Sequence, residues 1–352
     1  MAAGRPLTGG VSPGGKSEDG VCLVWGAFGF IGQHLTRHLL DAGVHVRVLC
    51  RSKPDLVVPD WAEQVEIFSF DSISSFEGAV RRALDGAAVV YAFAGSSGAV
   101  LSNRKPLESL TDNCEVQLRF LAACAELKSV PHVVFPSSRL VYGPTGKMVV
   151  SEEHLPNPQS MYAVHKVCVE QYLEVASYQG HITYTICRIT NPYGYDPSAN
   201  GGSYKILNYF VSNALAGKPI TLFGDGSQLR DFIHISDVVE RLAACRHAAA
   251  RNQVLNIATG VSRTLREAAE TICDITGAGL EFEPWPADYL AVESGDFVCS
   301  VNKADITLGP HTPKGLRTGL EETVETYRRA GAGALSTSLK RNNTARHNYV
   351  VR

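Results

Sequence analysis

The chain has 352 residues, of which 45% are hydrophobic and 19% are charged, and its formal net charge at pH 7 is −2. This length and apolar content allow one large domain or two small ones. The near-neutral charge gives no electrostatic footprint for nucleic acid or an anionic membrane, and no apolar run approaches the ~18 residues of a membrane span. The nine scattered cysteines form no C-x-x-C pair, so they are predicted to be buried thiols in a reducing, cytoplasmic compartment.

The two ends of the sequence differ in composition from its middle. Residues 1–19 carry many glycines and no apolar core of a secretory signal, and they are predicted to be a disordered leader. Residues 331–352 are rich in Gly, Ala and Ser and then basic, and they are predicted to be a disordered tail.

A glycine-rich turn follows the first apolar run, Val21–Trp25. Gly26, Gly29 and Gly32 are spaced three residues apart and lead into a helical pattern over 33–42. Such a turn can hold a dinucleotide pyrophosphate: the first glycine permits the turn, the second lets the backbone approach the phosphates, and the third lets helix and strand pack closely. The spacing differs from the common G-x-G-x-x-G, so the turn alone is a weak signal and needs the later motifs.

Apolar runs of strand length then alternate with helical patterns. The runs lie at 45–50, 65–70, 87–94, 132–137 and 182–188, and helical periodicity covers 107–127 and 162–177. This alternation predicts an α/β fold with a Rossmann-type doubly wound parallel sheet and ligands at the carboxyl ends of its strands. A less regular pattern after residue 188 predicts a smaller C-terminal α/β domain. The expected division assigns 20–188 with 231–258 to the dinucleotide-binding domain and 189–230 with 259–330 to the smaller domain.

The end of the second strand bears on which dinucleotide is bound. Dinucleotide folds usually place an acid there to hold the ribose hydroxyls, but this strand ends in Cys50, Arg51 and Ser52. Arg51 and Ser52 instead suit a 2′-phosphate, which favours NADP(H). An exposed arginine without a ligand is an equal alternative, so the choice between NAD and NADP stays open.

Two further strand ends offer cofactor contacts. Asp71 follows the strand 65–70, where it either hydrogen-bonds an adenine amino group or caps the next turn. Ala94 ends the strand 87–94, and the segment 95–98 after it lies where the backbone can pass close to a cofactor.

A tyrosine and a lysine one helical turn apart carry the predicted chemistry. Lys166 follows Tyr162 at i+4, and Ser138 stands at the end of a strand, 24 residues before the tyrosine. A free tyrosine has a pKa of about 10, and an adjacent ammonium favours its phenolate by charge attraction. Together with the serine hydroxyl, this set can move a proton on or off an alcohol while a nicotinamide takes or gives hydride. The eleven histidines show no metal-ligand spacing, so no metal site is predicted.

With these motifs the chain resembles the extended short-chain dehydrogenase/reductase superfamily, in its NAD-dependent nucleotide-sugar epimerase/dehydratase branch. The resemblance covers about residues 21–328. It rests on GAFGFIG at 26–32, SSRLVYG at 137–143, YAVHK at 162–166, RITNPYG at 188–194, GDGSQLRDFIH at 224–234, LNIATG at 255–260 and LRTGLEET at 316–323.

The resemblance implies a role for each matching position. The catalytic residues it implies are Ser138, Tyr162 and Lys166. The cofactor-binding residues it implies are Gly26, Gly29, Phe30, Ile31, Gly32, Asp71 at the adenine, Asn113, Tyr162 and Lys166. Asn191 and Arg230 match groups that hold the diphosphate of a nucleotide sugar, with Ser138 at the sugar itself, and an arginine fork suits phosphate oxygens. Relatives usually form homodimers through two long helices per subunit, here those at 107–127 and 162–177.

Several positions depart from the family pattern. Trp25 stands where a small Thr or Ser is usual, and 286–300 contains no arginine, although many relatives bring a second phosphate-binding arginine there. Positions 139–140 are Arg-Leu rather than the Asp-Glu pair that sugar 4,6-dehydratases use as acid and base, which disfavours that elimination.

The leading hypothesis is therefore an enzyme that epimerises a nucleotide sugar through a transient 4-keto sugar. The alternative is an NADPH-dependent 4-ketoreductase of a nucleotide-linked 4-keto-6-deoxyhexose, motivated by Cys50, Arg51 and Ser52. A second alternative is a non-catalytic, dinucleotide-binding sensor.

Overall fold

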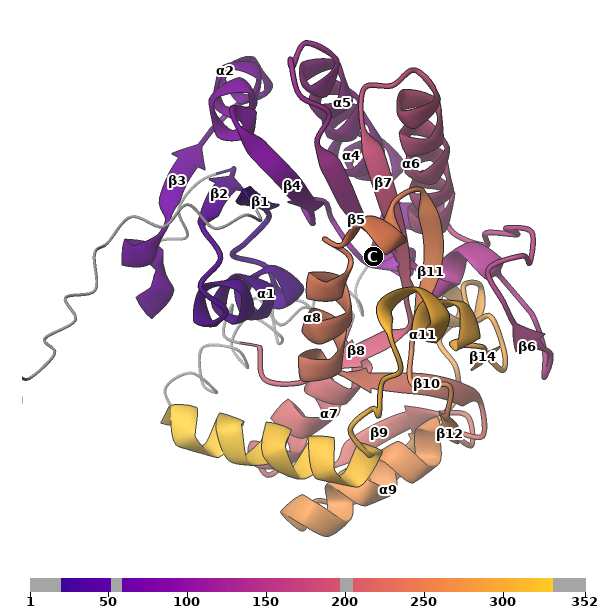
Figure 1. Cartoon of the computed structure of the whole chain (residues 1–352). Helices are drawn as coiled ribbons and strands as arrows, with labels where there is room; N and C mark the ends of the chain where they lie inside the picture. Colours follow the sequence, from indigo (N-terminus) through magenta and orange to yellow (C-terminus); the bar gives the residue numbers. More distant parts are fainter. Residues whose placement is uncertain (1–19, 52–58, 197–204, 332–352) are drawn as a thin grey trace, which may run out of the picture.

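Seven parallel strands form the central sheet of the protein, seen in a computed structural model that describes residues 20–51, 59–196 and 205–331 (Figure 1). The predicted leader, Ser52 and all of the predicted tail except Gly331 lie outside the described residues. From one edge to the other the strands are β3 (Glu66–Ser69), β2 (Val46–Cys50), β1 (Val21–Trp25), β4 (Ala87–Ala92), β5 (His132–Ser138), β7 (Thr183–Ile189) and β11 (Gln253–Ile257). The order reverses between β1 and β4, which confirms the predicted doubly wound Rossmann-type sheet.

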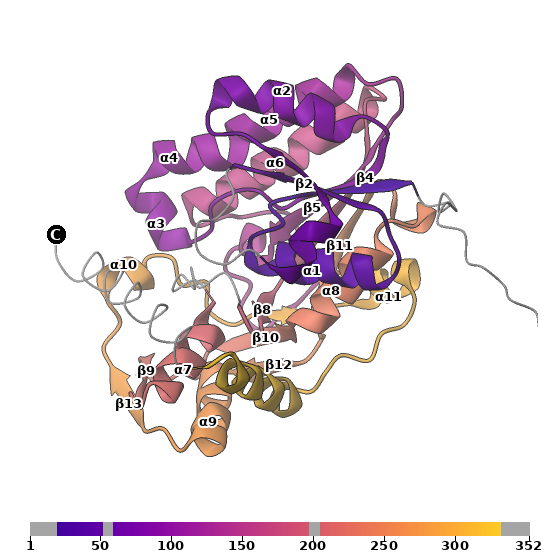
Figure 2. The same ribbon diagram turned by 90° about the vertical axis from the view of Figure 1, so that its left-hand side faces the viewer.

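Helices cover both faces of this sheet (Figure 2). One face packs against α1 (Phe30–Asp41), α8 (Ile235–Ala244) and α11 (Asn302–Leu308), and the other against α2 (Ile73–Leu84), α5 (Val116–Ala125) and α6 (Met161–Tyr178). Successive side chains of β1 alternate between the two cores, with Val24 on the first side and Leu23 on the second. Burial on both faces explains why the strands are almost continuously apolar.

A smaller layer lies against the carboxyl ends of the central strands. Its sheets are β8 (Asn191–Tyr193) with β10 (Leu229–His234) and β12 (Ser262–Thr264), and β9 (Ile220–Phe223) with β13 (Leu280–Glu283). They pack on α7 (Ile206–Leu215), α9 (Leu265–Thr276) and a helix over 316–331 around a separate core. We call the central sheet and the helices on its two faces the large layer. Because β10 belongs to the smaller layer and α8 to the large one, the chain returns to the large layer near residue 234.

Short elements complete the described part of the chain. The paired strands β6 (Val149–Val150) and β14 (Val298–Cys299) lie beside the large sheet. Other short elements are the helix α10 (Ala287–Leu290) and the 3₁₀ turns Asp60–Gln64, Arg139–Tyr142 and Ala248–Ala250.

The helix predicted over 107–127 is interrupted in the structure. It consists of α4 (Pro106–Leu110), a π-helical turn Thr111–Glu115 and α5, and a further helix that periodicity did not predict, α3 (Ala99–Arg104), precedes it. The amide of Asn113 donates to the Ser109 carbonyl at 3.0 Å and to Ser96 Oγ at 3.1 Å. The π turn thus carries an asparagine that ties the helix to the loop after β4, and amphipathic spacing does not report such a turn.

Trp25 and the cysteines serve the core. The Trp25 side chain is 1% exposed, and its ring centroid lies 5.4 Å from that of Phe76 and 5.3 Å from that of Phe120. The tryptophan that departs from the family pattern at this position therefore packs in the core between the sheet and the helices α2 and α5. All nine cysteines are free thiols, and all are buried except the half-buried Cys168 and Cys273. No helix within the three described ranges is long and apolar enough to cross a bilayer.

Candidate functional site

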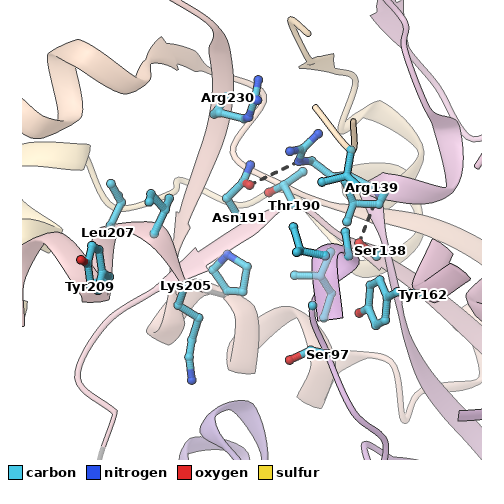
Figure 3. A pocket seen from close by; sticks show the side chains of 18 of the residues that line it. Ser97, Ser138, Arg139, Tyr162, Thr190, Asn191, Lys205, Leu207, Tyr209 and Arg230 are labelled. Atoms are coloured by element: carbon cyan, nitrogen blue, oxygen red, sulfur yellow. Dashed lines mark hydrogen bonds between the residues drawn. The ribbon is translucent and has the colours of Figure 1, made fainter. Parts of the chain in front are cut away.

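A cavity of about 1070 Å³ lies between the carboxyl ends of the central strands and the smaller layer. Its walls come from the glycine turn after β1, the loop after β4, the end of β5, the start of α6, and the small-layer elements β8, α7, β9 and β10. Eleven of the predicted site residues line it: Gly26, Gly29, Phe30, Ile31, Gly32, Asn113, Ser138, Tyr162, Lys166, Asn191 and Arg230. Segments far apart in the sequence thus form one site (Figure 3).

The glycine turn has no room for side chains at two of its three glycines. Gly26 has φ +94°, and a Cβ there would lie 2.8 Å from the Ala94 nitrogen. A Cβ on Gly32 would lie 2.2 Å from the Gly26 carbonyl oxygen. Gly29 is the N-cap of α1 and gives that helix no side-chain cap. The N–H groups at the N-terminus of α1 are therefore available to an anion in the cavity, which is the arrangement that a dinucleotide pyrophosphate requires.

Ser138 and Tyr162 lie next to each other in the lining of the cavity, because β5 ends and α6 begins there. Ser138 is the last residue of β5, and its Oγ accepts from the Leu140 N–H at 3.2 Å. Tyr162 lies in the first turn of α6, where its own N–H donates to Ser102 Oγ on α3 at 2.9 Å. The helix that periodicity missed thus fixes the start of the helix that carries the tyrosine.

Lys166, the lysine of the predicted triad, lies beside the ring of Tyr162. Lys166 Nζ donates to the Pro136 carbonyl at 2.7 Å and lies 5.6 Å from the centroid of the Tyr162 ring. Burial lowers the pKa of Lys166 to about 8, an effect that the nearby Glu170 carboxylate opposes. Burial also raises the pKa of Tyr162 to about 12, against the effect of the neighbouring Ser138 hydroxyl. In the protein alone burial therefore raises the pKa of Tyr162, whereas the sequence predicted that the lysine would lower it.

A buried hydrogen-bond network around Glu170 holds the part of α6 that carries Lys166. Glu170, one helical turn further along α6, accepts from Arg188 Nη2 at 2.7 Å and from Ser137 Oγ. Arg188 and Glu170 are both almost fully buried, at 5% and 4% exposure. Because Ser137 belongs to β5 and Arg188 to β7, this network fixes α6 against the two strands and positions Lys166.

The small layer contributes the two residues predicted to hold a diphosphate. Asn191 on β8 donates to the Asp231 carbonyl at 2.9 Å. Arg230 on β10 donates to the Gly295 carbonyl at 2.6 Å and forms an ion pair with Glu293. The structure therefore brings both side chains to one wall of the cavity, although 39 positions separate them in the sequence.

Arg139 is a cavity residue that sequence reasoning missed. Its Nε donates to Asn191 Oδ1 at 3.2 Å and its Nη1 to Ser294 Oγ at 3.1 Å, and the residue is 8% exposed. Burial and the neighbouring Arg230 lower the pKa of Arg139 to about 9. The sequence showed only that this position lacks an acid, and it offered no arginine in 286–300. The structure supplies a second arginine from the turn after β5 instead.

Aromatic side chains form the small-layer wall of the cavity, and these too were missed. Tyr209, Phe223, Trp285 and Tyr289 line it, with the Phe223 ring centroid 5.8 Å from that of Trp285 and 5.5 Å from that of Tyr289. They lie on α7, β9, α10 and the segment before α10, without a shared motif. The one signal for this wall in the sequence was the number of aromatic residues in an irregular part of it.

Three predicted cofactor residues do not line the cavity. Exposed Asp71 accepts from Ser72 Oγ at 3.1 Å and Ser75 Oγ at 2.8 Å, so it takes part in capping α2, as the alternative interpretation expected. Arg51 forms an ion pair with Asp112 at 2.6 Å. The Ala94 carbonyl accepts from Gln117 at 3.3 Å. A cofactor contact by Arg51, Ser52, Asp71 or Ala94 stays a prediction.

Comparisons with known proteins agree with this geometry. The family model described as "NAD dependent epimerase/dehydratase family" matches residues 22–258. The chain is 33% identical over 214 residues to a UDP-glucose 4-epimerase of Mycolicibacterium smegmatis. The matched stretch covers 59% of this chain and 66% of that protein. It is 26% identical over 323 residues to a UDP-N-acetyl-alpha-D-glucosaminuronate decarboxylase of Bacillus cytotoxicus, which covers 87% of this chain and 97% of that protein.

A solved structure extends the likeness to the whole fold. The UDP-glucose 4-epimerase of Thermus thermophilus, in complex with NAD, has a TM-score of 0.77 and 27% identity, over 88% of this chain and 99% of that one. The chain therefore belongs to the NAD-dependent epimerase/dehydratase family, the nucleotide-sugar enzymes of the extended short-chain dehydrogenase/reductase superfamily.

Proposed function

We propose that the protein is an NAD-dependent epimerase that inverts a hydroxyl-bearing carbon of a UDP-hexose through a transient 4-keto sugar. One observation carries the proposal: a single cavity joins the glycine turn, the pair Ser138 and Tyr162, and the pair Asn191 and Arg230. A dinucleotide and a nucleotide sugar can therefore meet at the tyrosine. UDP-glucose 4-epimerases among the relatives support the uridine nucleotide and the reaction.

In this proposal each residue has a defined task. Tyr162 accepts the proton of the sugar C4 hydroxyl and later returns it, while the Ser138 hydroxyl hydrogen-bonds the same oxygen. Lys166, anchored on the Pro136 carbonyl, places its positive charge beside the phenolate that forms. Asn191 and Arg230 hold the diphosphate, so that the sugar turns while the nucleotide stays bound.

The turn after β1 fits the dinucleotide by the criterion of space, since the cradle at Gly26 and Gly32 admits no Cβ. When bound there, NAD would supply the acceptor, and then the donor, of the hydride that leaves and rejoins the sugar C4.

The ketoreductase alternative depends on Arg51. Its side chain is exposed, is paired with Asp112 and does not line the cavity, which favours NAD over NADP and hence the epimerase. The family and its enzymatic relatives leave the non-catalytic sensor without support.

The test begins with the nucleotide that purified protein releases on denaturation. We expect NAD(H) near one equivalent, because an epimerase must keep its cofactor through the keto intermediate. The protein should then interconvert UDP-glucose with UDP-galactose, or the corresponding N-acetylated or uronic pair, without added cofactor. Failure on all three pairs would exclude the proposed epimerisation, and net consumption of NADPH with a 4-keto-6-deoxyhexose would establish the reductase.

We further propose that the protein is a homodimer through α4, α5 and α6. These neighbouring helices expose apolar side chains: Leu107 77%, Leu110 44%, Leu118 46%, Met161 45%, Val164 44%, Val175 56% and Tyr178 94%. Such a surface is typical of a helix-to-helix interface.

Light scattering should therefore give twice the monomer mass for the wild type. It should give the monomer mass for the double variant Leu118→Glu and Val175→Glu, because two charges per subunit would be buried unpaired. Ile306→Glu, at a residue 86% exposed on α11, should leave the mass unchanged. A monomeric wild type at micromolar concentration would contradict this proposal.

A further inference from the structure

The two arginines of the cavity differ in how their charges are balanced. Arg230 forms an ion pair with Glu293, whereas Arg139 donates to two neutral groups, Asn191 Oδ1 and Ser294 Oγ. Within the ranges that the structure describes, no carboxylate forms an ion pair with Arg139. This wall of the cavity therefore carries one positive charge without a direct counter-ion.

A buried charge without an ion-paired carboxylate is costly to keep. Arg139 is 92% buried, being 8% exposed, and its Nη2 group donates to no residue of the described ranges. The cost of desolvating such a guanidinium is offset when a ligand supplies an anion. Burial and the neighbouring Arg230 lower the pKa of Arg139 although the Glu293 and Asp231 carboxylates act in the opposite direction, so these carboxylates do not fully offset its burial.

The hydrogen bonds to Asn191 and Ser294, and the contact with the Phe297 ring, whose centroid lies 5.3 Å from the Arg139 Cζ, fix the side chain but supply no counter-ion. A neutral side chain with two donors, such as glutamine, can serve one or both neutral acceptors without desolvating a cation. The surplus charge faces the cavity between Ser138, at the sugar end, and Arg230, at the diphosphate end (Figure 3).

We infer that Arg139 binds an anionic oxygen pair of the substrate at the junction of diphosphate and sugar, and so selects substrates that carry one there. The inference rests on the proposed function for the orientation of the nucleotide sugar. Two groups offer this chemistry: the phosphate next to the sugar, and a carboxylate on the sugar itself. A planar guanidinium binds either one in a bidentate manner.

The experiment measures binding by calorimetry with NAD-loaded wild type, Arg139→Gln and Arg139→Lys, using UMP, UDP, UDP-glucose, UDP-glucuronate and inorganic pyrophosphate. Arg82→Gln, at an exposed arginine of α2, is the control for the loss of one charge. Arg139→Lys keeps the cation, so it carries the test with a smaller loss if Arg139→Gln does not fold.

If Arg139 binds the phosphate, Arg139→Gln weakens UDP and both UDP-sugars by about 10- to 100-fold and leaves UMP unchanged. If it binds a carboxylate, only UDP-glucuronate is weakened by that factor. Changes below about threefold for every ligand, or an equal loss for UMP and UDP, would overturn the inference. Pyrophosphate separates the two proposals: a wild type that binds it through Arg139 but binds no uridine nucleotide would refute the proposed function alone. A wild type that binds none of the five ligands would refute both.

Discussion

Replacing Tyr162 by phenylalanine should lower the turnover number by about 10²- to 10⁴-fold, the usual contribution of a positioned acid–base group. The change removes only the hydroxyl, and the aromatic ring can keep its place over Lys166. Bound NAD and the melting temperature should therefore stay close to those of the wild type. Steady-state kinetics measure the turnover number, the nucleotide content of the denatured protein measures the bound NAD, and thermal unfolding measures the melting temperature.

Tyr178→Phe is the matched control, because Tyr178 lies on the same helix but outside the cavity, and phenylalanine keeps the aromatic ring on the proposed dimer surface. Its turnover should equal that of the wild type. A Tyr162→Phe variant that kept more than a tenth of the wild-type turnover would show that another group moves the proton.

Replacing Gly32 by alanine should abolish the retention of NAD, with a loss of affinity of at least about 100-fold. The added Cβ would lie 2.2 Å from the Gly26 carbonyl oxygen and 2.8 Å from the Ala27 Cα, both of which are backbone atoms. The turn and α1 must separate to admit it, which moves the N–H groups that face the pyrophosphate. Overpacking of this kind also costs about 1–3 kcal/mol of stability, so the melting temperature should fall.

Gly78→Ala tests whether this effect is specific to the turn. Gly78 is exposed on α2, where an added Cβ would only touch the end of the Arg82 side chain at 3.6 Å. Alanine is a better helix former than glycine, so this variant should be about 0.5–1 kcal/mol more stable than the wild type and keep its NAD. Wild-type NAD content in Gly32→Ala would refute the close-packing argument.

Much of the large layer was predictable because its physical signals are local. Strands buried on both faces must be apolar, and the glycines at 26 and 32 stand where no other residue fits. Ser138 ends a strand and Tyr162 lies in the first turn of the next α-helix, so their spacing in the sequence also indicated their places in the fold. Each of these features is encoded within a short stretch of the sequence.

The rest depended on contacts between distant segments. Arg139 acquires its surroundings from Asn191 and Ser294, the latter 155 positions away, and no spacing rule reports such a meeting. Asp71 illustrates the converse: its sequence position suits two roles, and the structure shows its hydrogen bonds to the two serines that follow it while the adenine contact stays a prediction.

The path of the chain between its two layers has a consequence for the exchange of specificity among relatives. The smaller layer comprises β8 to β10, then β12 to β13, then the helix 316–331, with α8, β11 and α11 of the large layer between these pieces. No single contiguous graft transfers the whole small-layer wall from one homologue to another. Arg139, moreover, comes from the large layer, so such a transplant would leave its charge behind. In this architecture a change of substrate is most accessible through individual side chains.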